Sequence, residues 1–240
     1  MPSITTPGIV LRHANYRDHD RMLTILSPRY GRLDVLSRGC RRPKSALMPA
    51  SELFVHGEFV CYQQNDHATL SSCQITDTFY PLRLEPYRLT CASYMTALCA
   101  AAVQPGEDSA ALYALLLKGL YYLSDEPEAD PLETTTAFLL LFADAIGYRP
   151  RLSRCAHCRT PLDLTNGAPF DIAAGGLCCP GCASRSTFCM TVDAIKWMSE
   201  TIRSGLKPQK NTGAGTLFDV LRRYVEMRLE IPIKVSRLLP

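Results

Sequence analysis

The sequence lacks any apolar run long enough to cross a membrane. Its longest strongly apolar stretch covers only residues 137–143, whereas a helix that spans a bilayer needs about 20 predominantly apolar residues. The first residues also lack the basic segment and the following apolar segment of a secretory signal. We therefore expect a soluble cytoplasmic protein that has no membrane partner.

The sequence also lacks the short motifs of several enzyme classes. We find no Gly-x4-Gly-Lys-Ser/Thr phosphate loop, no His-Glu-x2-His helix and no Gly-x-Ser-x-Gly elbow. Gly213 and Gly215 precede a predicted helix, but a third glycine and a preceding strand are missing, so this segment is interpreted as a loop. We predict a non-catalytic protein. Because catalytic triads assemble in space from distant residues, an enzyme that acts on nucleic acid remains a third interpretation.

The charges nearly balance over the whole chain, at a net charge of +3, but they are unevenly distributed. Lys and Arg outnumber Asp and Glu by nine to three in residues 12–44 and by nine to four from residue 196 to the end. In residues 77–133 the ratio is reversed, at three to nine. Clustered cations recruit polyanions even when the net charge is small. The basic ends favour an anionic partner, with ordinary surface solvation as the alternative.

The first 80 residues are expected to form a small closed barrel. Short segments rich in Val, Ile, Leu, Thr, Phe and Tyr are bounded by turn signals, which predicts five strands at residues 8–14, 21–27, 32–37, 53–63 and 69–78. A turn at Asn65-Asp66 would join the last two. Closure removes the exposed edges of such a sheet. We predict a five-stranded antiparallel barrel of the OB type, with an SH3-like barrel as the alternative, and an α+β fold overall.

The rest of the chain, residues 81–240, is expected to form a helical domain. Ala- and Leu-rich periodic segments predict helices at residues 86–103, 109–124 and 132–147, and two more at 192–203 and 216–229. Thr216 can cap the last helix, and Asp219 can stabilise its first turn through the helix dipole.

Residues 149–189 interrupt the helical pattern and carry the most specific motif in the chain. This segment has eight Gly or Pro residues and six cysteines but little apolar periodicity, so it cannot build a core alone. It contains Cys155-x2-Cys158 and, further on, Cys179-x2-Cys182. Two such pairs supply four sulfur ligands to a tetrahedral zinc at about 2.3 Å. Because such a site has no open position, we predict one structural zinc per chain in a module inserted into the helical domain.

Other uses of the cysteines are less compatible with the pattern. A thioredoxin-type redox pair would need a single Cys-x2-Cys at a helix start, and a zinc deaminase would need a general-acid Glu that is absent here. His157 is interpreted as a solvent-facing bystander, and Cys178 breaks the spacing to Cys182. The remaining cysteines are expected to be small buried hydrophobic residues: Cys40, Cys61, Cys73, Cys91, Cys99 and Cys189.

A basic run follows the third predicted strand. Gly39 and Pro43 indicate an irregular loop, and this loop carries the cations Arg38, Arg41, Arg42 and Lys44. OB barrels bind nucleic acid through one face and its adjoining loops, where cations track the phosphates and aromatic rings stack on bases. The run therefore predicts a phosphate clamp. The aromatic residues available for stacking are Tyr16, Tyr30 and Tyr62.

Together these segments resemble the bacterial RecO family. The likeness in the first domain lies in Gly8-Ile-Val-Leu-Arg12, Tyr16-x3-Asp20-Arg21, Tyr30-Gly31-Arg32 and Arg38-Gly-Cys-Arg-Arg-Pro-Lys-Ser45. Later segments follow in the same order, namely Ile146-Gly147-Tyr148, Gly175-Gly-Leu-Cys-Cys179-Pro-Gly-Cys182 and Leu221-Arg-Arg-Tyr224. The likeness covers nearly the whole chain.

The resemblance implies a recombination mediator that is associated with the nucleoid. Such a protein binds single- and double-stranded DNA, anneals complementary strands, and works with RecR to load RecA. It also contacts the acidic C-terminal tail of the single-stranded DNA-binding protein. The resemblance assigns zinc to the four paired cysteines, and it assigns DNA contact to Arg21, Arg32, Arg38, Arg41, Arg42 and Lys44. The alternative is a zinc-ribbon adaptor that binds proteins rather than DNA.

Overall fold

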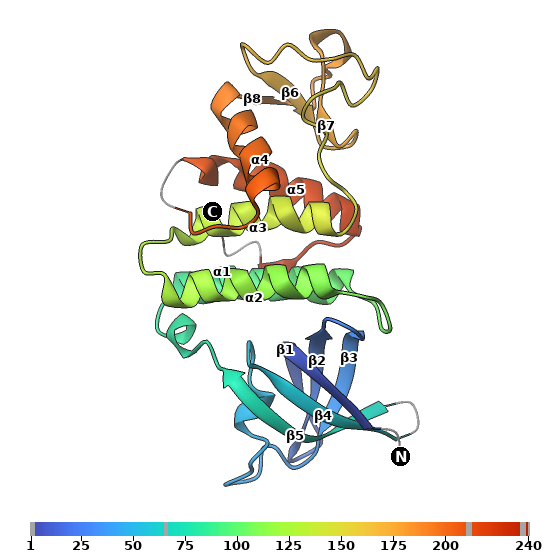
Figure 1. The fold of residues 1–240 in the computed structure, drawn as a ribbon, viewed down its shortest axis with the longest axis vertical. Helices are drawn as coiled ribbons and strands as arrows, with labels where there is room; N and C mark the ends of the chain where they lie inside the picture. The colour runs from blue at the N-terminus through green and yellow to red at the C-terminus, as the bar shows by residue number, and fades with distance from the viewer. Residues whose placement is uncertain (1–2, 65–66, 210–212, 236–238, 240) are drawn as a thin grey trace. The chain divides into compact units, whose positions relative to one another are not determined.

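The computed structural model describes residues 3–64, 67–209, 213–235 and 239. The chain divides into two compact units, Met1–Ser124 and Asp125–Pro240, which are drawn in Figure 1. The first unit contains two helices as well as the barrel, and the expected division at residue 80 stays a prediction. The turn expected at Asn65-Asp66 lies outside the described residues.

Five strands form a closed barrel in the first unit. They are β1 (Ser3–Tyr16), β2 (Asp20–Ser27), β3 (Gly31–Ser37), β4 (His56–Gln64) and β5 (His67–Asp77), and they close in the order β1-β2-β3-β5-β4. Neighbours pair antiparallel, except that β3 and β5 pair in parallel through Val35 with Ala68 and Leu36 with Thr69. The predicted α+β fold and its five-stranded OB-type barrel are confirmed, and the pairing of β3 with β5 is the one parallel exception.

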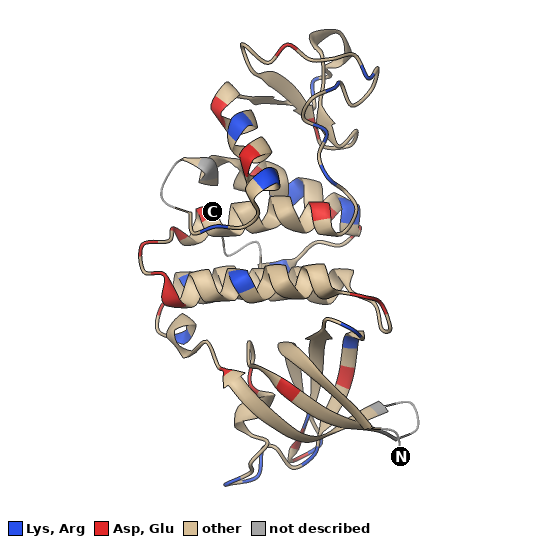
Figure 2. Ribbon diagram, viewed as in Figure 1, with Lys and Arg blue, Asp and Glu red and all other residues tan. Residues whose placement is uncertain are grey.

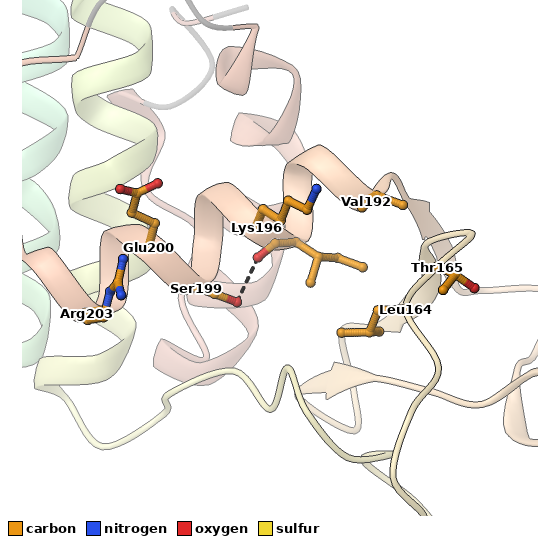
Figure 3. Close-up of a pocket in the computed structure, with 8 residues that line it drawn as sticks. Leu164, Thr165, Val192, Lys196, Ser199, Glu200 and Arg203 are labelled. Atoms are coloured by element: carbon orange, nitrogen blue, oxygen red, sulfur yellow. Dashed lines mark hydrogen bonds between the residues drawn. The ribbon is translucent and has the colours of Figure 1, made fainter.

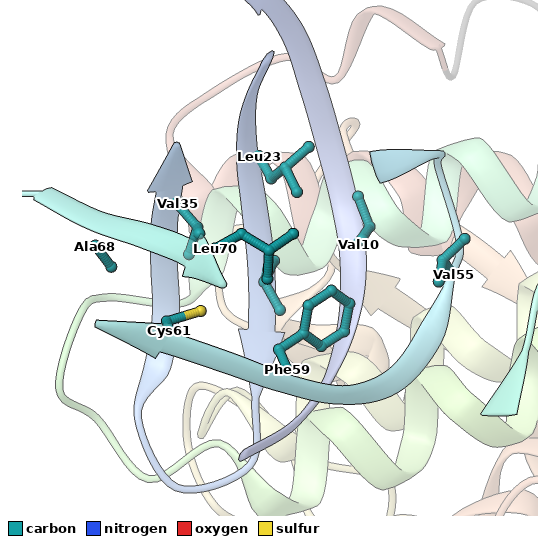
Figure 4. Close-up of a cluster of buried hydrophobic side chains, with 9 residues drawn as sticks. Val10, Leu23, Val35, Val55, Phe59, Cys61, Ala68 and Leu70 are labelled. Atoms are coloured by element: carbon teal, nitrogen blue, oxygen red, sulfur yellow. The ribbon is translucent and has the colours of Figure 1, made fainter. Parts of the chain in front are cut away.

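The barrel interior is filled by alternate residues of every strand. Side chains of β1, β2, β3, β4 and β5 meet in one buried cluster (Figure 4), which includes Val10, Leu23, Val35, Phe59 and Leu70. Successive side chains of a strand point to opposite faces, so the residues between these can face outward. β1 serves two neighbours, because its first half pairs with β4 and its second half pairs with β2.

Two helices complete the first unit. After the short 3-10 helices η1 (Pro49–Ser51) and η2 (Tyr80–Arg83) come α1 (Pro86–Ala102) and α2 (Ala110–Asp125). The loop between α1 and α2 is joined to the β2–β3 turn by three backbone hydrogen bonds. The N–H of Arg32 donates to the carbonyl of Gln104, that of Gly106 to Tyr30, and that of Ser109 to Pro28. Gly31 has a positive φ of 64° there, and a side chain would collide with this loop.

The second unit is built around α3 (Pro131–Ala145), whose residues from Glu133 to Ala143 are all buried. Its first turn is capped by Asp130, whose carboxylate accepts from the N–H of Glu133 at 2.9 Å. α3 packs against α4 (Val192–Ser204) and α5 (Phe218–Leu229). Thr191 caps α4 by accepting from the N–H of Ala194. Among the described residues, no helix is both long enough and apolar enough to cross a membrane.

The predicted cap of the last helix is wrong, whereas its acidic first turn is confirmed. Thr216 lies within a short 3-10 helix, η4 (Ala214–Leu217), and its hydroxyl donates to the carbonyl of Gly213. α5 therefore begins after Leu217 without a side-chain cap, and Asp219 lies in its first turn. The extra 3-10 turn shifts the helix start by two residues relative to the prediction.

Residues 149–189, here called the cysteine module, lie between α3 and α4. They contain a three-stranded sheet in the order β7-β6-β8, made of β6 (Ala168–Asp171), β7 (Gly176–Leu177) and β8 (Phe188–Met190), with η3 (Pro180–Cys182) between the last two. The module is attached to α5, because Phe170 meets the ring of Tyr224 edge to face at 5.8 Å. The Tyr224 hydroxyl also donates to the carbonyl of Tyr148 at 2.8 Å.

Candidate metal centre and nucleic-acid surface

The two predicted cysteine pairs meet in the cysteine module. The Sγ atoms of Cys155, Cys158, Cys179 and Cys182 all lie within 4.8 Å of one another. The Sγ atoms of Cys158 and Cys179 are 3.8 Å apart. Sulfur atoms bound to one tetrahedral ion at about 2.3 Å are about 3.8 Å apart, so this spacing fits a single metal ion. The donor set of four sulfurs leaves no open ligand position.

Backbone hydrogen bonds shape each pair into a tight turn. In the first turn the N–H of Arg159 donates to the carbonyl of Cys155, and the N–H of Cys155 donates to Thr160. In the second, the N–H of Cys182 donates to the carbonyl of Cys179. A bond from the N–H of Ala156 to the carbonyl of Leu177 joins the two turns across β7. The short local spacing therefore sets each pair, and the sheet brings the pairs together.

The thiol pKa values show that the cluster favours negative charge unequally. Backbone N–H groups of Cys179 and Cys158 lower the pKa of the Cys155 thiol to about 5. The pKa of the Cys182 thiol is raised to about 12, chiefly because it is held as a hydrogen-bond donor to Cys179 and Cys158. Four adjacent thiols cannot all ionise without a neutralising cation. A bound divalent ion would supply that charge, as metal ligation by cysteine requires thiolates.

His157 and Cys178 lie beside the four sulfurs without joining them. The side chain of His157 is exposed, as predicted. Its Nε2 atom lies 3.0 Å from a carboxylate oxygen of Asp171, so it also has a partner in the module. Asp171 also accepts from the backbone N–H groups of Ala173 and Ala174. The side chain of Cys178 is fully buried against Cys155. These contacts hold the first cysteine turn in place. The contact of His157 with Asp171 was not predicted from the sequence.

The remaining cysteines follow the expected pattern with one exception. Cys40, Cys61, Cys91 and Cys99 are buried, and Cys73 is half-buried. Cys189 is exposed, so the expectation of burial is wrong for this residue. It lies in β8, at the rim of the small sheet, where its backbone pairs with Pro169 and its side chain points outward.

The predicted basic run forms an ordered loop at one end of the barrel, here called the basic loop (residues 38–44). It is tied to the β1–β2 turn, because the N–H of Gly39 donates to the carboxylate of Asp20 at 2.7 Å and the N–H of Arg41 donates to the carbonyl of His19 at 3.0 Å. In OB barrels the loop between the first two strands belongs to the oligonucleotide-binding surface. The basic loop thus lies against the β1–β2 turn of this barrel.

The cations of the basic loop face solvent. Arg38, Arg41, Arg42 and Lys44 are all exposed. Within the described residues, Arg41, Arg42 and Lys44 form no ion pair with a carboxylate, although the Arg41 side chain donates to the backbone carbonyl of Asp18. Lys44 has a positive φ of 64°, a conformation uncommon outside glycine, so the loop holds a defined shape.

An aromatic side chain and one further cation lie in the turn to which the basic loop is tied. Tyr16 is 41% exposed at the end of β1, and the guanidinium of Arg17 lies 5.2 Å from the centre of its ring. Arg17 was missed by the sequence analysis, and its position next to Tyr16 in the β1–β2 turn was the available signal. Proteins that bind single-stranded nucleic acid combine exposed aromatic rings with nearby cations.

The other two predicted cations, Arg21 and Arg32, each pair with a carboxylate. The Arg21 guanidinium is largely buried and pairs with Glu52 at 2.7 Å, and it also donates to the carbonyl of Ser51. Arg32 pairs with Asp34 at 3.2 Å. It is the second residue of β3, roughly 20 Å along the chain from Arg38 at about 3.3 Å per residue. DNA contact by Arg21 and Arg32 stays a prediction, and both side chains already have carboxylate partners.

The other two predicted tyrosines lie in the barrel, and two of the C-terminal cations have carboxylate partners on α5. Tyr30 lies in the β2–β3 turn, and Tyr62 is half-buried in β4, where it pairs with Ser3 and Thr69. On α5, Arg222 and Arg223 both pair with Asp219. Arg222 also pairs with Glu226, so two carboxylates of the same helix match the two charges.

Comparisons with known proteins agree with this geometry over both units. A family model described as "Recombination protein O N terminal" matches residues 1–79, and one described as "Recombination protein O C terminal" matches residues 83–237. Both matches leave only a few residues of the chain outside.

Individual relatives carry the same description. The chain is 33% identical over 175 residues to "DNA repair protein RecO" of Moorella thermoacetica, which covers 73% of this chain and 64% of that protein. It is 28% identical over 237 residues to the protein of that name in Acetivibrio thermocellus, with 96% and 93% covered. The relative in Symbiobacterium thermophilum is 33% identical over 176 residues, with 73% and 69% covered. The chain therefore belongs to the RecO family of DNA repair proteins.

Proposed function

We propose that this chain is a non-catalytic recombination mediator. It binds single- and double-stranded DNA, anneals complementary strands and, together with RecR, helps to load RecA onto DNA coated by the single-stranded DNA-binding protein. It acts in the cytoplasm at the nucleoid. Membership of a DNA repair family supports the biological setting, and the surface of the barrel supports the physical mode of binding.

The observation that carries the proposal is the basic loop and its attachment to the β1–β2 turn. Free cations bind DNA chiefly by neutralising phosphates and releasing counterions, and such contacts position the protein without reading base sequence. Arg41, Arg42 and Lys44 are exposed and have no carboxylate partner among the described residues. Tyr16 adds an exposed ring for stacking on unpaired bases. The surface therefore suits unrelated sequences, as annealing requires.

We assign zinc to the four-sulfur cluster of Cys155, Cys158, Cys179 and Cys182. A set of four thiolates is typical of structural zinc, and the sulfur spacing fits the Zn–S distance. When bound, zinc holds the two turns together and carries out no chemical step. Elemental analysis of protein purified without added metal should find one zinc per chain. Zinc retained by a Cys155→Ser/Cys158→Ser double variant would contradict this assignment.

The protein partners follow from the family. RecR is one expected partner, and the acidic C-terminal tail of the single-stranded DNA-binding protein is another. Such a tail would pair its carboxylates with cations and bury its terminal apolar side chain. Failure of a tail peptide to bind, or unchanged binding to a partner that lacks the tail, would argue for a different route of loading.

A salt titration tests the DNA-binding role of the basic loop. If Arg41, Arg42 and Lys44 each neutralise one phosphate, the Arg41→Ala/Arg42→Ala/Lys44→Ala variant should flatten the salt slope for single-stranded DNA by about 2, because each contact contributes about 0.7. Arg29→Ala/Lys118→Ala/Lys207→Ala removes the same charge from three exposed positions outside the loop and should leave the slope unchanged. The affinity should fall similarly for DNA of unrelated sequence.

Three outcomes would favour other interpretations. Lost thermal stability of the loop variant with an unchanged salt slope would make the loop structural. A wild-type chain that binds no DNA, yet captures a repair protein, would favour the adaptor. Turnover of DNA in the presence of metal or nucleotide would favour an enzyme.

A further inference from the structure

The start of the cysteine module is unusually basic. Residues 149–159, here called the connector, contain Arg149, Arg151, Arg154 and Arg159 but no Asp or Glu. All four side chains are exposed. The charge-coloured ribbon shows basic segments along this stretch as it leaves α3 (Figure 2). This shorter cluster lies outside the two basic chain ends, so a count of the charges in those ends does not reveal it.

Among the residues that the structure describes, three of the four connector arginines have no carboxylate partner. Arg149 is neutralised by Asp144, to which it donates two hydrogen bonds at 2.6 and 2.7 Å. Arg151 and Arg154 donate only to backbone carbonyls, those of Ala156 and Arg159. In the described parts of the chain, Arg159 has no ion pair. A carbonyl satisfies a hydrogen bond but leaves the charge of a guanidinium in place.

The connector presents these charges on a fixed backbone. The N–H of Arg151 donates to the carbonyl of Gly175, and the carbonyl of Arg151 accepts from the N–H of Leu177. Arg154 and Arg159 flank the first cysteine turn and are held by its backbone bonds. A ligand that binds them therefore does not have to order the chain, and the entropic cost of binding is small.

Two adjoining hollows lie along α4, and the connector lines the smaller of them. One, of about 390 Å³, is lined by Arg151, Arg154 and the α4 residues Ser199 and Ile202. The other, of about 940 Å³, shares Ser199. In Figure 3, Leu164 and Thr165 of the cysteine module lie opposite the α4 face that carries Lys196. α4 adds the cations Lys196 and Arg203 to this second hollow, together with the carboxylate of Glu200.

We propose that the connector and the adjoining face of α4 bind the sugar–phosphate backbone of single-stranded nucleic acid, as a second site separate from the basic loop. The inference rests on the proposed function, since annealing brings two strands to one protein. Planar guanidinium groups match phosphate oxygens, and all four connector cations are arginines. Tyr148 precedes the connector and is 45% exposed, so a ring for base stacking is also present.

A pair of charge-matched variants of the full chain tests the site. Arg151→Gln/Arg154→Gln/Arg159→Gln removes the three unpaired charges. Arg29→Gln/Lys118→Gln/Lys207→Gln removes three charges from exposed positions outside the connector and α4. With labelled oligothymidylate, the connector variant should flatten the salt slope by about 2, and the control should not change it. Equal slopes for wild type and the connector variant, or an equal loss in the control, would overturn the proposal.

Further measurements separate charge from structure. Arg151→Lys/Arg154→Lys/Arg159→Lys keeps the charges and should keep the salt slope, with zinc content unchanged. If this variant loses as much as the glutamine variant and also loses zinc, the arginines act by bracing the cysteine turn and the proposal fails. A connector variant that binds oligothymidylate normally but loses an acidic peptide would likewise overturn the proposal and assign the surface to a protein partner.

The basic-loop variant, measured alongside, distinguishes this inference from the proposed function. A flattened slope for the loop variant alone removes the second site and leaves the barrel site. A flattened slope for the connector variant alone supports the second site and contradicts the proposed role of the barrel loop. Flattened slopes for both variants, with annealing lost in each, support two strand-binding surfaces on one chain.

Discussion

The barrel and the cysteine module hold their backbones fixed by different means. Nine buried apolar residues, eight from the five strands and Val55 just before β4, fill the barrel. The module has a small buried cluster of Cys155, Ala156 and Cys178 around its sulfurs, and Phe170 and Leu177 are buried as well. Below about 40 residues, metals or disulfides usually replace a hydrophobic core. With the proposed zinc bound, one chain would use apolar burial in its large domain and metal ligation in its small module.

Metal removal should separate the two regions most strongly. Structural zinc contributes about 10–16 kcal/mol in isolated zinc-finger peptides, because the ligands are not assembled in the unfolded chain. Chelation, or Cys158→Ser, should therefore abolish most hydrogen-exchange protection in residues 149–189. Protection of the barrel strands should stay as in the untreated protein. Loss of protection in both regions would contradict the comparison.

A cavity created in the barrel core should destabilise the barrel and leave the cysteine module unchanged. Phe59 is fully buried in the core, so Phe59→Ala should lower the free energy of unfolding of the first unit by about 3–5 kcal/mol. Zinc content should not change. Leu84→Ala serves as the control, because Leu84 is 65% exposed and its loss should change stability by about 0.5 kcal/mol or less. Denaturant unfolding followed by hydrogen exchange measures both.

The contacts of the module with α5 should contribute less to its stability than the proposed zinc does. Tyr224→Phe keeps the ring against Phe170 but removes the hydroxyl that donates to Tyr148. We expect a loss of about 1 kcal/mol in the stability of the second unit, the usual net value of one hydrogen bond. Tyr121→Phe, at an exposed position, should have no measurable effect. A loss of zinc from the Tyr224 variant would show that the attachment and the metal site are coupled.

Acid should weaken the first unit slightly through His56. Burial lowers the pKa of His56, and the Coulombic effect of Asp77 only partly opposes this. The folded state therefore binds fewer protons than the unfolded state, so the contribution is present at neutral pH and is lost as the pH falls below the ordinary value of about 6.5. His56→Gln should flatten the pH dependence of unfolding in this range. An unchanged profile would assign the dependence to other groups.

The sequence predicted the elements whose signals are local. The cysteine pairs were predictable because two residues of spacing set each turn, and the five strands followed from composition and turn residues. β1 begins at Ser3, five residues before its predicted start at Gly8, and Pro7 lies within the strand. The closing contact of β3 with β5 could not be predicted, since it depends on the three-dimensional closure of the barrel.

The nucleic-acid residues show the same limit. The basic loop was predictable from its run of cations between glycine and proline. The pairing of Arg32 with Asp34 was also predictable, because residues two apart lie on the same face of a strand. The pairing of Arg21 with Glu52 was not, because these residues are distant in the sequence and meet only in the folded barrel. The carboxylates that neutralise Arg222 and Arg223 lie within one helix turn and could have been found.

The bonds between the β2–β3 turn and the α1–α2 loop decide how the protein can be cut for study. A fragment that ends at residue 80 would replace the partners of Arg32, Tyr30 and Pro28 with water and would uncover the apolar side of the sheet that α1 contacts. A fragment that ends at Ser124 keeps all three bonds. The shortest portable form of the barrel is therefore about half the chain.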